Sequence, residues 1–194
     1  MRRTIPHAAA LIAIATLTLA SCTSEQLLTE VPADRAGFFN QEPAPGFGAM
    51  TRSTPLARDE VVRVTIGAEG GRIDLPGAGA ALVVPRGALS EETDITMRAI
   101  AGHVVAFEFA PHGLTFETPA TISVRARGTE AEEVLTRPGR DELEGQTLER
   151  YLGVYYEGDP AHGVDALETF EIRLHGDALV YEIEHFSGYV SASG

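Results

Sequence analysis

The chain has 194 residues, with 15 basic against 28 acidic residues and a formal net charge of −13 at pH 7. Every basic residue is Arg, and the absence of Lys excludes Schiff-base chemistry and the phosphate-binding lysine of P-loop proteins. So acidic a chain repels nucleic acid and anionic lipid headgroups, and we expect neither as a partner.

The first 22 residues indicate an exported, lipid-anchored protein. Arg2 and Arg3 precede an apolar run, Ala8 to Ala20, that has the length of a signal peptide and is too short to span a bilayer. The run ends in "LASC", whose cysteine, Cys22, has no other cysteine to pair with, and this motif resembles the lipobox of bacterial lipoproteins. The resemblance implies cleavage before Cys22 and acylation of Cys22. The alternative is an ordinary secretory signal followed by a stray cysteine.

These features divide the chain into three parts. Residues 1–21 are the expected signal peptide, and residues 22–58 a lipid-anchored flexible linker rich in Pro, Gly and Ala without apolar periodicity. The folded domain is expected over residues 59–194. Thr23 stands where an Asp would resemble an inner-membrane retention signal, so we expect anchoring in the outer membrane. The mature chain then carries 13 Arg against 28 acidic residues, a net charge of −15.

From Val61 onward, short apolar runs with period two predict strands separated by Gly, Pro and Asp. The expected strands are Val61–Ile66, Gly71–Leu75, Ala81–Pro85, Asp94–Ile100, His103–Ala110, Thr121–Ala126, Tyr151–Tyr156, Thr169–Leu174, Leu179–Phe186 and Gly188–Ala192. This pattern predicts an all-β fold, an antiparallel β-sandwich or barrel. The charged stretch Ala126–Thr147 interrupts the strands as either a mobile loop or a short surface helix, and part of it, Thr129–Gln146, is a candidate surface for a partner.

Alternation also predicts which side chains fill the core. Apolar residues flanked by polar or small neighbours should point inward, because successive side chains of a strand face opposite sides. They are Val83, Ile95, Phe107, Phe109, Ile122, Val124, Ile172, Leu174 and Ile183.

Two stretches resemble the ZU-five domain, a family named for zonula occludens and Unc-five proteins and found also in ankyrins. The first is "GGRIDLPGAGAALVVPRGALSEETDITMRAI", in which Val84 to Leu89 match a Val-Pro-x-Gly-Ala-Leu turn. The second is "FEFAPHGLTFETPATISV", which is similar to a Gly-Pro-His-Gly-Leu-x-Phe hallmark with Ala110 in place of its first Gly. A Trp frequent near the end of the domain is absent. The resemblance implies an antiparallel β-sandwich that serves as an interaction or spacer module without catalysis.

No residue pattern points to a conventional enzyme. Histidines are scattered without the spacing of metal ligands (His103, His112, His162 and His175), and the motifs of serine hydrolases and zinc proteases are absent. We therefore expect no cofactor, no metal and no enzyme activity. A hydrolase or glycan binder with a site assembled by tertiary contacts is a further alternative, weakened by the absence of Trp, the best platform for a sugar ring.

One tripeptide carries a specific chemical possibility. His185-Phe186-Ser187 matches the autoproteolysis site of ZU-five relatives that signal through death domains. By that resemblance, Ser187 attacks the Phe186 carbonyl in an N-to-O acyl shift with His185 as base, and water then hydrolyses the ester. Gly188 supplies backbone freedom for the bend that this chemistry needs.

Strand alternation explains the same tripeptide without chemistry. It places Ile183 and His185 on one face and Glu184 and Phe186 on the other, before a bend at Ser187-Gly188. We favour this interpretation and an intact chain. The preferred function is a lipid-anchored, non-catalytic interaction module with a protein partner at the cell envelope. Self-cleavage between Phe186 and Ser187 is the alternative.

Overall fold

The computed structural model describes residues 39–41, 47–159 and 163–194. They form strands of two to 13 residues, one α-helix and one 3-10 helix. In chain order these are β1 (Phe39–Gln41), β2 (Gly48–Ala49), β3 (Thr51–Leu56), β4 (Glu60–Ile66), β5 (Gly71–Leu75), β6 (Ala80–Val84), β7 (Thr93–Ala99), β8 (Gly102–Val104), β9 (Ala106–Ala110), β10 (Thr115–Arg125), α1 (Glu132–Thr136), η2 (Arg140–Leu143), β11 (Thr147–Asp159), β12 (Gly163–His175), β13 (Ala178–His185) and β14 (Gly188–Ser193).

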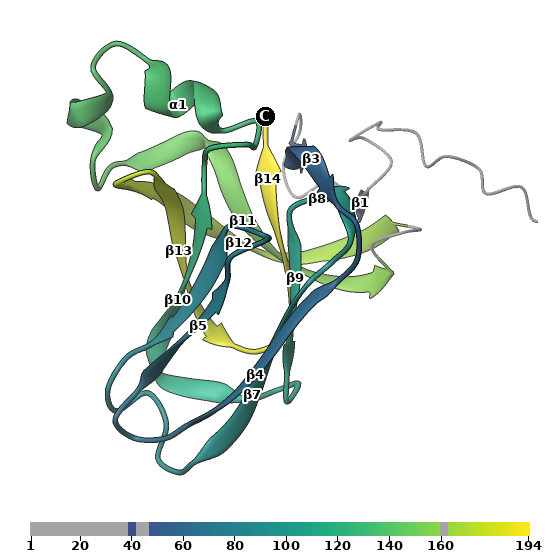
Figure 1. Cartoon of the computed structure of the whole chain (residues 1–194), viewed down its shortest axis with the longest axis vertical. Coiled ribbons are helices and arrows are strands. Elements are labelled where there is room, and N and C mark those ends of the chain that lie inside the picture. Colours follow the sequence, from purple (N-terminus) through teal and green to yellow (C-terminus); the bar gives the residue numbers. More distant parts are fainter. Residues whose placement is uncertain (1–38, 42–46, 160–162) are drawn as a thin grey trace, which may run out of the picture. The chain divides into compact units, whose positions relative to one another are not determined.

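One antiparallel sheet curves until it nearly closes on itself (Figure 1). Its strand order is β4-β7-β9-β14-β11-β12-β13-β10-β6-β5, so β4 and β5 are its two ends. Strand β2 pairs with β14, β1 pairs in parallel with β12, and β3 and β8 form a separate two-stranded sheet. The predicted all-β antiparallel fold class is confirmed. The two layers that face each other across the core belong to one curved sheet.

The first family hallmark has a structural role. Gly70 lies in the turn between β4 and β5 with a φ of 75°, and a Cβ on it would lie 2.4 Å from the Val84 carbonyl oxygen. Only glycine tolerates both constraints at once. In the turn after β6, Ala88 and Leu89 are 1% and 5% exposed, so this turn folds back onto the core. These residues therefore shape the domain.

One hydrophobic cluster fills the space between the walls of the sheet. Almost all residues expected to point inward are buried in it: Ile95, Phe107, Phe109, Ile122, Val124, Ile172, Leu174 and Ile183. The prediction is wrong for Val83, which is half-buried outside the cluster, whereas Leu82 and Val84 face inward. Five apolar residues in a row, Ala80 to Val84, conceal the alternation there, and a slip of one residue turns a side chain to the opposite face.

The expected strand His103–Ala110 is divided into two strands by Val105. The Val105 N–H donates to the Met50 carbonyl at 2.9 Å, and its carbonyl accepts the Ser191 N–H at 3.0 Å. Because Val105 bonds to two other segments, β8 can pair with β3 while β9 joins the main sheet between β7 and β14. An unbroken apolar run hides such a change of partner.

The folded part begins before residue 59, the expected start of the domain. Strands β2 and β3 lie within the expected linker 22–58, and Met50 is 0% exposed. Phe47 packs on a second apolar cluster of β9, β11 and β14. The sequence shows no apolar alternation here, because the buried residue of β3 is Arg52. The expected signal peptide, Cys22, and residues 22–38 and 42–46 of the expected linker lie outside the described residues.

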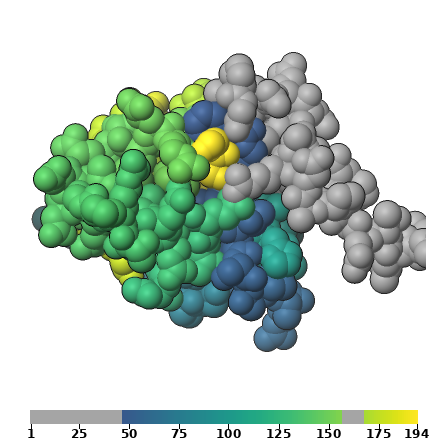
Figure 2. All heavy atoms as spheres, turned by 90° about the horizontal axis from the view of Figure 1, so that it is seen from above, coloured from purple at the N-terminus to yellow at the C-terminus, as the bar shows by residue number. Residues whose placement is uncertain are grey.

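The insertion Ala126–Thr147 contains helices α1 and η2, so the short-helix alternative is correct. Ala131 and Val134 are 0% and 5% exposed, which places one side of the insertion in the core. Figure 2 shows the end of β14 (yellow) between the insertion (green) and the strands that follow residue 47 (dark blue).

Candidate functional site

The tripeptide His185-Phe186-Ser187 forms the connection between β13 and β14. Strand β13 ends at His185 and β14 begins at Gly188, so Phe186 and Ser187 belong to neither strand. Both strands are central in the sheet, since β13 lies between β12 and β10 and β14 lies between β11 and β9. The connection is therefore held by strong pairing on both sides.

Phe186 is a core residue, contrary to the alternation prediction that placed it opposite Ile183. It is 1% exposed, stacks on Phe109 with ring centroids 5.0 Å apart, and meets Phe116 edge-on at 4.9 Å. The prediction is wrong because the strand ends one residue earlier, at His185, and period two applies only within a strand.

The backbone of Phe186 is bonded on both sides by the corner that contains the second family hallmark. Its N–H donates to the Leu114 carbonyl at 2.8 Å, and its carbonyl accepts the Gly113 N–H at 3.1 Å. Gly113 has a φ of 76°, a conformation that favours glycine and directs this N–H toward Phe186. The carbonyl that self-cleavage would attack thus has one fixed hydrogen-bond donor.

The His185 side chain is engaged away from Ser187. The Tyr189 hydroxyl donates to the His185 carbonyl at 2.6 Å and lies 3.3 Å from His185 Nδ1. His185 Nε2 lies 3.5 Å from Glu168 Oε2, and the Tyr155 ring meets the imidazole edge-on at 5.1 Å. Among the described contacts, none joins the imidazole to the Ser187 hydroxyl, so base and nucleophile are not coupled in this arrangement.

Tyr189 keeps its proton under ordinary conditions. Burial raises the pKa of the Tyr189 phenol well above its ordinary value, and the nearby Tyr181 and Glu168 add to the rise. A protonated Tyr189 remains a hydrogen-bond donor, so its bond to the His185 carbonyl is maintained.

Gly188 has a different role from the one expected. A Cβ at Gly188 would lie 2.7 Å from the Tyr156 ring, so glycine is required by close packing between neighbouring strands. Its φ is outside the left-handed range. The expectation that Gly188 supplies a bend is wrong.

The other described histidines lie apart from one another, and His162 lies outside the described residues. His103 Nδ1 bonds the Arg52 carbonyl oxygen at 2.8 Å, His175 lies 2.9 Å from Glu144, and His112 is exposed. Within the part of the chain that the structure describes, no group of three or more His, Cys, Asp or Glu residues is placed to hold a metal ion.

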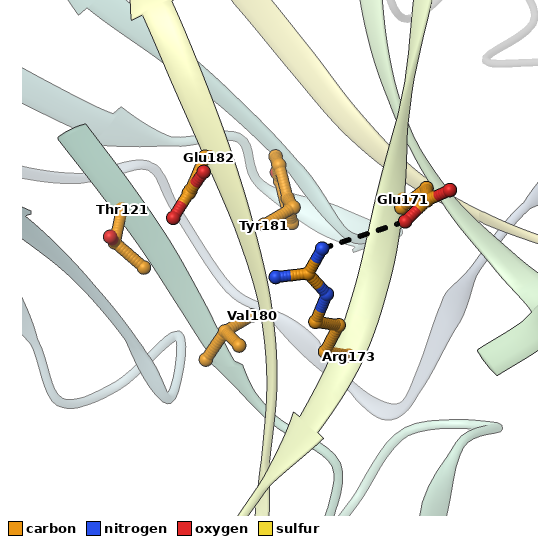
Figure 3. A pocket seen from close by; sticks show the side chains of 6 residues that line it. All are labelled: Thr121, Glu171, Arg173, Val180, Tyr181 and Glu182. Carbon is orange, nitrogen blue, oxygen red and sulfur yellow. Dashed lines mark ion pairs between the residues drawn. The ribbon is translucent and has the colours of Figure 1, made fainter. Parts of the chain in front are cut away.

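A shallow hollow of about 140 Å³ lies on the outer side of β10, β12 and β13 (Figure 3). Its lining includes Thr121, Glu182 and an ion pair of 3.6 Å between Arg173 and Glu171. The volume is below that of typical ligand pockets, about 300–1,000 Å³. Among the described contacts, no hydrogen bond joins the Thr121 hydroxyl to a carboxylate of this lining.

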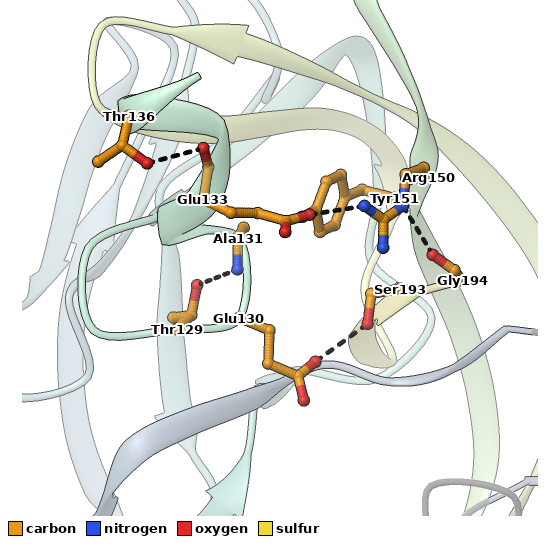
Figure 4. A network of polar contacts seen from close by, with 9 residues as sticks. All are labelled: Thr129, Glu130, Ala131, Glu133, Thr136, Arg150, Tyr151, Ser193 and Gly194. Atoms are coloured by element: carbon orange, nitrogen blue, oxygen red, sulfur yellow. Dashed lines mark hydrogen bonds and ion pairs between the residues drawn. The ribbon is translucent and has the colours of Figure 1, made fainter. Parts of the chain in front are cut away.

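Sequence reasoning missed a polar network that ties the insertion to both ends of the domain (Figure 4). Glu130 accepts hydrogen bonds from the Thr51 hydroxyl at 2.8 Å and the Ser193 hydroxyl at 3.0 Å. Arg150 pairs with Glu133 at 2.7 Å and donates to the Gly194 carbonyl at 2.9 Å. These contacts join residues far apart in the chain, which no local pattern reveals.

Comparison with known families supports the resemblance over part of the chain. The model of the ZU5 domain matches residues 62–106, a stretch from β4 to the first residue of β9. No curated protein matches the chain. None of the described helices is both long and apolar enough to cross a membrane. A ZU5-type domain, a kind associated with protein interaction, is therefore supported for this part of the fold.

Proposed function

We propose that the protein is a lipid-anchored component of the bacterial outer membrane whose β domain is a non-catalytic interaction module for a protein partner. The match of residues 62–106 to the ZU5 domain carries the interaction part of the proposal. The contacts of the His185 imidazole with Glu168 and Tyr189 support a module that does not cleave itself. The "LASC" motif that ends at Cys22 supports the anchor.

The anchor is tested by labelling cells with an alkyne analogue of palmitate. The full chain and the Ser24→Ala control are expected to take up label and to enter the detergent phase on phase separation. Cys22→Ser should do neither, because it removes the thiol that is acylated. Labelling of Cys22→Ser equal to that of the control would refute lipidation at this residue.

The interaction is tested by placing a photocrosslinking amino acid at exposed positions around the domain, in cells. A module with a partner crosslinks to one protein from neighbouring positions on one surface. A module without a partner shows either no crosslink or diffuse products from every surface, and this outcome contradicts the proposal.

Self-cleavage is the second candidate function, and one contact favours it. The Gly113 N–H bonded to the Phe186 carbonyl would stabilise negative charge on that oxygen during attack by Ser187. The reaction also needs His185 to leave Glu168 and Tyr189 and to approach Ser187. The mass of the purified chain distinguishes this candidate from the intact module.

A further inference from the structure

The two ends of the curved sheet, β4 and β5, border an open seam. Among the strands that the structure describes, β4 pairs only with β7, and β5 pairs only with β6. The two strands are consecutive in the chain, yet no backbone ladder joins them among the described residues. Each therefore presents N–H and C=O groups that lack a strand partner, on facing edges.

The edge of β4 lacks two features that usually prevent strand addition, a bulge and a proline. Its pairing with β7 is regular over seven residue pairs, from Glu60 opposite Ala99 to Ile66 opposite Thr93. Its exposed charged side chain, Arg63, is paired with Asp94 at 2.6 Å. Val61 is 54% exposed, and among the described residues no other large apolar side chain is exposed to this extent. Regular, apolar edges of this kind pair readily with another chain.

The core beside the seam is incompletely covered. Val62 and Val64 point toward the hydrophobic cluster but are only half-buried, whereas Ile95 and Met97 on the neighbouring strand β7 are 0% exposed. One more strand along β4 would cover both valines. Completing the burial of these two side chains would remove further apolar surface from water, which suits a weak, specific peptide site.

The seam has defined ends and little free charge. At one end, the Glu60 carboxylate accepts the N–H groups of Gly77 at 3.1 Å and Ala78 at 2.7 Å, which ties the turn after β5 to the start of β4. At the other end, the turn around Gly70 joins the strands. The charged side chains of both edges are already paired, Arg63 with Asp94 and Arg72 with Asp74. A neutral occupant leaves these pairs intact.

We propose that this seam binds an extended, neutral segment of a partner protein, with apolar residues at alternate positions, that adds as a strand to β4. The inference rests on the proposed interaction function and specifies its surface. Main-chain hydrogen bonds to the free edge supply affinity, and the alternate apolar side chains cover Val62 and Val64.

The probe is a short capped peptide of alternating threonine and valine, with the same peptide carrying a central proline as control. Amide hydrogen exchange of the full-length protein is followed by NMR. We expect the alternating peptide to slow exchange of the edge amides of β4 and β5 by at least about tenfold in a saturable manner. The proline peptide should leave them unchanged. No protection at millimolar peptide, or protection confined to other strands, overturns the proposal.

Two adjacent substitutions locate the site. Successive N–H groups of a strand point to opposite edges, so one of Val61→Pro and Val62→Pro removes a bond to β7 and the other removes a donor to the seam. The variant that keeps the melting temperature has lost the seam donor, and it should lose the peptide effect. An unchanged peptide effect in that variant contradicts the seam as the site.

Cell crosslinking separates this inference from the function on which it rests. If a partner is found and the stable proline variant still binds it, the seam assignment is wrong and the interaction module stands. If no partner is found from any surface, the proposed function is wrong whatever the peptide does.

Discussion

The Gly113 N–H donates a 3.1 Å hydrogen bond to the Phe186 carbonyl oxygen, and this contact fixes the peptide bond that self-cleavage would break. The same bond also stabilises an intact chain, because it holds Phe186 in the core against Phe109 and Phe116. Whether the chain is cleaved or stays intact depends on whether a base can reach the Ser187 hydroxyl. His185 is engaged with Glu168 and Tyr189, and a hydroxyl without a base is a weak nucleophile.

We predict that the purified protein remains intact. Its mass under denaturing conditions should correspond to an unbroken Phe186–Ser187 bond, and Ser187→Ala should differ only by the lost oxygen. Denaturing conditions matter because β14 is paired on both edges and a nicked chain would stay together in native conditions. A stoichiometric break at this bond that disappears in Ser187→Ala would establish the self-cleaving alternative.

Truncation of Phe109 tests the core. Phe109 is 1% exposed, and the centroid of its ring lies 5.0 Å from that of Phe186 and 5.9 Å from that of Tyr189. Phe109→Ala should lower the free energy of unfolding by about 3–5 kcal/mol, from lost transfer energy and the cavity that remains. The control is Val83→Ala, which removes a half-buried side chain outside the cluster and should cost about 1 kcal/mol or less. Equal losses in urea denaturation would contradict the assigned core.

The sequence predicts strands well where one apolar face alternates with polar residues. Strands β4, β5 and β7 were expected within one residue of their observed bounds, because period two is unbroken there. Prediction from alternation fails at β3, where the buried residue is Arg52. It also fails at Val83, where neighbouring apolar residues hide which side chains face inward.

The candidate site was only partly predictable, for a different reason. The tripeptide is visible as letters, but its geometry depends on Gly113, Glu168 and Tyr189, which reach it through the fold. The seam likewise follows from which strands remain unpaired, a property of the whole sheet. Contacts between distant segments leave no periodic signal in a single chain.

The insertion should behave as a packed part of the domain. Glu130 accepts hydrogen bonds from Thr51 and Ser193, which links the insertion to β3 and β14. Glu130→Ala leaves both hydroxyls without this acceptor and should cost about 1–3 kcal/mol of unfolding free energy. Glu142→Ala, at an exposed position of the same insertion, is the matched control and should change stability by no more than about 0.5 kcal/mol. If urea denaturation shows no difference between the two variants, the network does not stabilise the domain.

Arg52 carries a buried charge with few partners. It is 6% exposed, one nitrogen donates to the Val104 carbonyl, and its Nε and Nη2 have no hydrogen-bond partner. Burial lowers the pKa of Arg52 to about 10, although the nearby Glu60 opposes the shift. Such a shift corresponds to a cost on the order of 3 kcal/mol for the charged form at neutral pH. The lost hydrogen bond from a charged donor is worth about 1.5–3 kcal/mol, which does not exceed this cost, so Arg52→Met should be at least as stable as the natural protein at pH 7.

The same substitution should change the response to alkali. Burial raises the pKa of Tyr181 and Tyr189 above 10, so between about pH 10 and 12.5 the unfolded chain loses these protons first and stability falls as pH rises. Arg52 acts in the opposite direction, because burial lowers the pKa of its guanidinium in the folded form alone, so that the folded form releases this proton at a lower pH than the unfolded form does. The stability of the natural protein should therefore fall less steeply with rising pH than the stability of Arg52→Met. Urea denaturation at successive pH values between 10 and 12 measures both slopes. Parallel slopes for the two proteins would show that Arg52 keeps its proton in the folded state throughout this range.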